Sequence, residues 1–156
     1  MIVGSIKEDL SFEKRVSITP ETAKNIINLG LKVIIENNYA THIGILDKEY
    51  ETVGVEIKKS SKEVFNNCNL LAKVNCPSDD EISNLKDKTI LIGMLNPSKN
   101  QNKINNILKK ILIYFLLNYY PVYHELNPWM FCLPNQIWQA IDRLLTQFTS
   151  LKKLFQ

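Results

Sequence analysis

The chain has 156 residues, of which 45% are apolar and 22% charged, and its formal net charge is +3. These values are typical of one soluble globular domain, and the small, dispersed positive charge argues against nucleic acid as a partner. The apolar run Ile111–Leu117 is far shorter than the roughly 20 residues that span a bilayer. The sequence after Met1 lacks the pattern of a secretion signal.

The three cysteines, Cys68, Cys76 and Cys132, are expected to be small buried hydrophobes. Their spacing matches no CxxC or Cys/His zinc motif. An odd number of cysteines without a signal peptide suits a reducing cytosol. We therefore predict no metal site and a cytoplasmic location.

Strands and helices alternate along the first 58 residues. The β-rich run Ile2–Ile6 predicts a first strand. Thr19 and Pro20 suit the N-cap and the first position of a helix that Gly30 is placed to end. The pattern continues with a strand, a short helix closed by Gly54 and a third strand, at Lys32–Glu36, Asp47–Thr52 and Val55–Ile57.

Two capping boxes mark helix starts in the next 50 residues. Ser60 with Glu63, and Ser78 with Glu81, have the Ser-x-x-Glu spacing in which the two residues cap each other's backbone. The other predicted elements are two apolar strands and an amphipathic helix, at Leu70–Val74, Thr89–Gly93 and Asn100–Lys109.

This alternation predicts an α/β fold with an open, mainly parallel, doubly wound (Rossmann-like) sheet. Ligands of such sheets bind outside the carboxyl ends of the strands, which places the loops after Ile6, Val74 and Gly93 at the functional edge. No two glycines are closer than ten residues. The GxGxxG and Walker patterns that hold phosphates are therefore absent.

Several motifs resemble one protein family. Its members begin with a strand, an I-x-K-E element and an E-x-R-V-A-x-T-P loop, which this chain resembles at Ile6–Glu8 and Glu13–Pro20. Further similar stretches are Lys73–Pro77, Asp80–Ile82 and Leu91–Gly93. The family comprises the α subunit of proton-translocating NAD(P) transhydrogenase and alanine dehydrogenase. The resemblance covers residues 1 to about 110.

The branch within the family depends on the residues after Leu91–Gly93. Alanine dehydrogenases resemble each other in carrying a histidine there, in a Y-L-H triplet that contacts pyruvate. Here the residues are Met94-Leu95-Asn96-Pro97, which are more similar to the transhydrogenase branch. His42, on a predicted loop, is expected to be solvated and not a ligand.

Two cations match positions that bind the substrate carboxylate in alanine dehydrogenases. These are Arg15 and Lys73, whose guanidinium and ammonium groups suit a carboxylate. The transhydrogenase branch binds no amino acid, so the alternative is that both residues are structural. We expect no catalytic residue in this chain.

The composition changes abruptly at Lys109-Lys110. All five glycines lie at or before Gly93, whereas ten of the fourteen aromatic residues lie beyond Lys110. We therefore assign residues 1–110 to the α/β domain. Residues 111–156 are expected to form an irregular tail, with a strand at 111–117, mobility after Pro121, and an incidental amphipathic helix around Trp138.

The tail regains the family pattern when its codons are read in the frame that begins one base earlier. With suitable third bases, the sequence from Lys110 becomes N-I-N-I-F-S-I-E-L-L-P-R-I-S-R-A-Q-S-M-D. Each shifted codon allows only a few amino acids, yet the family motif is available at nearly every one. Because Lys109-Lys110 encodes a run of adenines, we interpret 111–156 as the out-of-frame product of a decayed or split gene.

The resemblance implies that the intact enzyme transfers hydride between NADH and NADP⁺ and couples this to proton translocation. Its cofactor is NAD(H), and its partners are the remainder of the α subunit and the membrane-embedded β subunit, with a homodimer as a further option. The complex lies at the cytoplasmic membrane. The R-I-S-R-A-Q loop and the glycine-rich turn that hold NAD(H) are absent here, so we expect this chain to bind no cofactor and to be inactive alone.

Two other functions remain open from the sequence. One is an alanine dehydrogenase-like substrate domain that uses Arg15 and Lys73. The other is a non-enzymatic interaction module, for which the aromatic tail residues Trp129, Phe131 and Trp138 would supply a contact surface.

Overall fold

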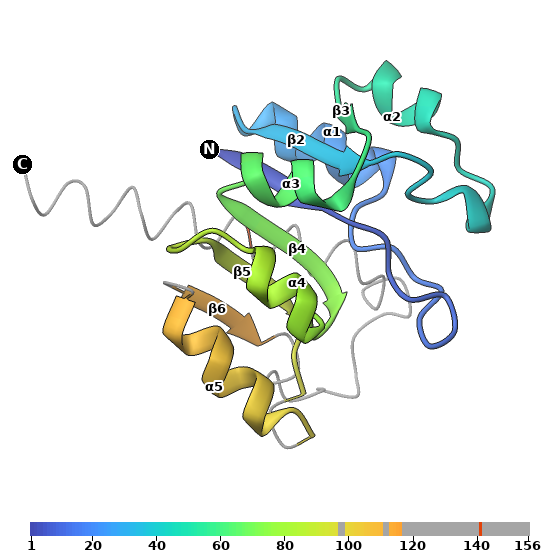
Figure 1. The fold of residues 1–156 in the computed structure, drawn as a ribbon. Coiled ribbons are helices and arrows are strands. Elements are labelled where there is room, and N and C mark those ends of the chain that lie inside the picture. Colours follow the sequence, from blue (N-terminus) through green and yellow to red (C-terminus); the bar gives the residue numbers. More distant parts are fainter. Residues whose placement is uncertain (97–98, 111–112, 117–140, 142–156) are drawn as a thin grey trace, which may run out of the picture.

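The computed structural model describes residues 1–96, 99–110, 113–116 and 141. Within them, six parallel strands form one sheet in the order β3-β2-β1-β4-β5-β6 (Figure 1). The strands are β1 (Ile2–Ser5), β2 (Lys32–Glu36), β3 (Glu56–Lys58), β4 (Leu70–Asn75), β5 (Ile90–Met94) and β6 (Ile113–Leu116).

Helices pack on both faces of the sheet (Figure 1). They are α1 (Pro20–Asn28), α2 (Asp47–Thr52), α3 (Ser61–Asn67), α4 (Asp79–Asn84) and α5 (Gln101–Lys110), with a 3₁₀ turn, η1, at Thr41–Ile43. One core cluster joins α1 and α2 to the sheet through Ile26 and Tyr50. A second cluster joins α3, α4 and α5 to the opposite face through Phe65, Ile82 and Ile107. The predicted doubly wound, Rossmann-like fold is therefore confirmed.

The helix starts follow the capping residues of the sequence. Thr19 accepts the Thr22 N–H before α1, and Ser78 and Glu81 cap each other at α4. At α3 the predicted box is only half formed. Ser60 accepts the Glu63 N–H, but the Glu63 carboxylate accepts the Lys59 N–H and not that of Ser60.

The third strand lies one residue later than predicted, at Glu56–Lys58. The reason is local, because the Val55 N–H donates to the Tyr50 carbonyl at 3.1 Å. That bond closes the turn after α2, so Val55 packs in the core without pairing in the sheet. The other strand and helix boundaries agree with prediction to within a residue or two.

Gly93 allows an unusually close approach between two central strands. A Cβ at this position would lie 2.5 Å from the backbone oxygen of Lys73. The β4–β5 register also shifts between Ala72 and Asn75. Only glycine fits without moving β5 away from the strand that carries Lys73.

The structure describes part of the tail. The strand expected within 111–117 is present as β6, which pairs with β5, and Ile141 is fully buried in the core cluster of α1 and α2. The predicted mobility after Pro121 and most of the helix expected around Trp138 fall outside the described residues. Among the helices that are described, none is long and apolar enough to cross a membrane.

Candidate functional site

The strand order places a crevice between β1 and β4. From β1 the chain proceeds outward through β2 and β3, and from β4 it proceeds in the opposite direction through β5 and β6. In open α/β sheets, ligands bind at the carboxyl ends of the strands where the winding reverses. The loop after β1 and the turn between β4 and α4 flank this point, and both carry charged residues.

Arg15 lies on the loop after β1 and is bound side-on by Glu13. Its Nε donates to Glu13 Oε1 at 2.9 Å, and its Nη2 donates to Glu13 Oε2 at 2.7 Å. The hydrogen bond from Arg15 holds the Glu13 pKa below its ordinary value. The arginine side chain is 54% exposed, and its Nη2 also lies 4.0 Å from the sulfur of Met94, at the end of β5. This loop therefore reaches across β4 to β5.

Lys73 lies near the end of β4, and its side chain is only 6% exposed. Its ammonium contacts both carboxylate oxygens of Glu81, at 2.7 and 2.5 Å. One of these oxygens, Oε2, also accepts the Ser78 N–H at 2.8 Å. The capping box of α4 thus fixes the carboxylate that neutralises Lys73.

Glu8 is a third carboxylate in the same place, and the residue is 8% exposed. Its Oε1 accepts the Val74 N–H at 2.7 Å. Burial raises the pKa of Glu8 from 4.5 to about 7, against the opposing effects of nearby Lys73 and the backbone hydrogen bonds. Glu8 also interacts electrostatically with Arg15 and Glu81, so it links the two cations.

A buried hydroxyl network anchors the loop that carries Arg15. Tyr39 Oη accepts the backbone N–H of Ser17 at 2.9 Å and that of Ile18 at 3.2 Å. The Ser5 and Ser17 hydroxyls contact the same oxygen and each other, and both donate to the Ala72 carbonyl on β4. The network therefore joins β1, the loop and β4 beneath the charged residues.

The structure brings the two predicted cations to one edge of the sheet. Sequence reasoning missed their partners Glu8, Glu13 and Glu81 as members of the site. A signal for Glu13 was present, since it stands two residues before Arg15 inside the family motif. Glu81 was recognised only as a helix cap. The five residues together form what we call the charge cluster: Glu8, Glu13, Arg15, Lys73 and Glu81.

The remaining candidates lie apart from a metal or nucleophilic role. His42 is exposed, as expected, and its Nε2 lies 2.8 Å from the Lys14 carbonyl. Cys68 is buried and free, and burial raises its pKa to about 11, whereas Cys76 is only half-buried. Cys132 lies outside the described residues. In the part of the chain that the structure describes, no three metal-ligating side chains gather.

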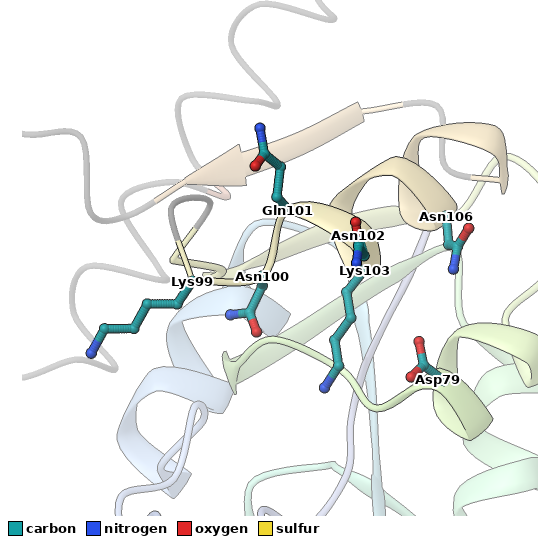
Figure 2. A pocket seen from close by; sticks show the side chains of 7 residues that line it. All are labelled: Asp79, Lys99, Asn100, Gln101, Asn102, Lys103 and Asn106. Carbon is teal, nitrogen blue, oxygen red and sulfur yellow. The ribbon is translucent and has the colours of Figure 1, made fainter.

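A hollow of about 520 Å³ lies where α4 and α5 begin (Figure 2). Lys103 and Asn106 on α5 face Asp79 at the start of α4. The other lining residues are Lys99, Asn100, Gln101 and Asn102. None belongs to the charge cluster, so we do not place the functional site there.

Fold and charge cluster together define a Rossmann-like domain with a crevice of paired charges and no glycine-rich phosphate loop. The chain belongs to the family described as "Alanine dehydrogenase/PNT, N-terminal domain", whose sequence model matches residues 4–122. The predicted family is therefore confirmed. Its match runs past Lys110, the predicted end of the domain.

Relatives come from both branches of the family. The chain is 33% identical over 125 residues to the first polypeptide of a divided NAD(P) transhydrogenase subunit alpha from Rickettsia prowazekii, covering 78% of this chain and 33% of that protein. It is 35% identical over 96 residues to alanine dehydrogenase of Methanococcus maripaludis, covering 62% and 26%. The crystal structure of transhydrogenase from Sinorhizobium meliloti superposes with a TM-score of 0.71 at 26% identity, covering 78% and 36%. The chain thus spans about a third or less of the length of these relatives.

Proposed function

We propose that this chain is the N-terminal part of the NAD(H)-binding α subunit of a proton-translocating NAD(P) transhydrogenase. In the intact enzyme this subunit transfers hydride between NADH and NADP⁺. The partners are the remainder of the α subunit and a membrane-embedded β subunit, at the cytoplasmic face of the membrane. The protein's contribution to such chemistry is to position two nicotinamides, because the cofactors carry the hydride.

The observation that carries this proposal is the tail read in the neighbouring frame. That frame supplies the R-I-S-R-A-Q-S-M-D loop, which resembles the NAD-contacting loop of transhydrogenases. Asn96, which replaces the histidine of alanine dehydrogenases, favours the same branch. We therefore propose a one-base slip at Lys109-Lys110, which leaves this chain without the loop and inactive alone.

The test compares this chain with a frame-restored chain. Sequencing of genomic DNA and messenger RNA across the codons of Lys109-Lys110 is expected to show an adenine run, followed by the motif in the neighbouring frame. One added base in that run restores the reading. The chain as it stands should leave NADH fluorescence unchanged, whereas the restored gene, continued into its second domain, should encode a protein that alters it. A neighbouring frame without the motif would refute the slip, and micromolar NADH binding by the present chain would refute its inactivity.

Arg15 and Lys73 have a structural role in this proposal. Both cations lie against carboxylates of the same chain, as expected for a domain that binds no amino acid. An alanine dehydrogenase-like domain would instead need at least one of them to exchange its internal partner for a substrate carboxylate. Glu13 opposes that exchange at Arg15, and Glu81 opposes it at Lys73.

A further inference from the structure

The charge cluster contains its own counter-charges. Three carboxylates face two cations, so the cluster carries one net negative charge when all five groups are ionised. A carboxylate ligand would enter as a fourth negative group. It can bind at Lys73 only if it displaces an internal carboxylate, because the ammonium is almost fully buried and already contacts both oxygens of Glu81.

Glu81 is held in that position from two sides. The Ser78 N–H binds its Oε2, and the Ser78 hydroxyl accepts the Glu81 N–H at 3.2 Å, so the reciprocal cap fixes where α4 presents the carboxylate. A charge-assisted contact between a buried ammonium and a preorganised carboxylate is strong, because little side-chain freedom is lost when it forms. A free carboxylate would lose translational freedom to replace it.

We propose that Glu81 is an internal competitor for Lys73 that excludes small carboxylates from the crevice. Glu81 is then a specificity-determining residue of this edge of the sheet, and its removal uncovers a carboxylate site formed by Lys73 and the exposed side of Arg15. Glu8 stays beside Lys73 and continues to balance its charge. The inference concerns the binding site alone and does not depend on the reading frame of the tail or on hydride transfer.

The test is the affinity of the full chain for acetate, followed by amide chemical shifts of residues 73–75 at constant ionic strength, with chloride as the balancing anion. We expect Glu81→Ala to bind acetate at least tenfold more tightly than the unmodified chain. Glu81→Gln, which loses the charge but keeps an acceptor for the Ser78 N–H, should shift affinity in the same direction by a smaller factor. The double variant Glu81→Ala with Lys73→Met should lose the gain.

Glu49→Ala is the matched control. Glu49 caps α2 by accepting the Leu46 N–H at 2.9 Å, so this variant loses an equivalent helix cap outside the charge cluster. It should bind acetate as weakly as the unmodified chain. If Glu81→Ala does not fold, Glu81→Gln decides the matter. An affinity within twofold of the unmodified chain in the folded Glu81 variants, or a gain that survives Lys73→Met, would overturn the proposal.

Discussion

Replacing Tyr39 by phenylalanine removes one oxygen from a fully buried network. Two backbone N–H groups, of Ser17 and Ile18, then lose the acceptor that they share. The serine hydroxyls keep the Ala72 carbonyl as a partner. Each buried donor left unpaired costs about 1–3 kcal/mol. We therefore expect Tyr39→Phe to lower the free energy of unfolding by about 2–4 kcal/mol, measured by urea denaturation.

Tyr50→Phe provides a matched comparison. Tyr50 is equally buried, and its ring packs edge-on against that of Tyr39 with the centroids 5.9 Å apart. Its hydroxyl donates a hydrogen bond of 2.9 Å to the Ile18 carbonyl. Loss of a single hydrogen bond costs about 1 kcal/mol. If Tyr50→Phe proves as destabilising as Tyr39→Phe, then the two N–H groups at Tyr39 do not dominate and the reasoning is wrong.

Two further predictions concern stability. Gly93→Ala places a methyl group 2.5 Å from the Lys73 carbonyl oxygen and should destabilise the fold by about 1–3 kcal/mol; an unchanged urea midpoint would contradict this. Burial raises the pKa of Glu8 from 4.5 to about 7, so the folded state binds more protons than the unfolded state between these values. Stability contributed by Glu8 is therefore lost as pH rises through this window. Relative to the unmodified chain, Glu8→Gln should gain up to about 2 kcal/mol between roughly pH 5 and 8, and a pH-independent difference would refute the assignment to Glu8.

Local signals made most of the fold predictable. Thr19, Ser60 and Ser78 cap helices through contacts within four residues, and such contacts are visible in the sequence. The start of β3 was misplaced because the Val55 N–H is taken by a carbonyl five residues earlier. Apolar periodicity gives no indication of such a turn.

The site was less predictable because its contacts are distant in sequence. Arg15 and Lys73 were identified through a family resemblance, but the bond from Val74 to Glu8 joins residues 66 positions apart. Tyr39 follows β2 in a polar stretch where nothing marks it as the acceptor for Ser17 and Ile18. Glu81 has a complete local explanation as a helix cap, and that explanation concealed its contact with Lys73.

The place of β1 in the middle of the sheet has a kinetic consequence. One edge of β1 pairs with β2, which begins at Lys32, but the other pairs with β4, which begins at Leu70. During synthesis the second edge stays open until the ribosome has released β4, and an open strand edge is a template for pairing with other chains. Closing such a long loop is also slow relative to local pairing. The junction that holds the charge cluster is thus completed only after the polypeptide on both of its sides has emerged.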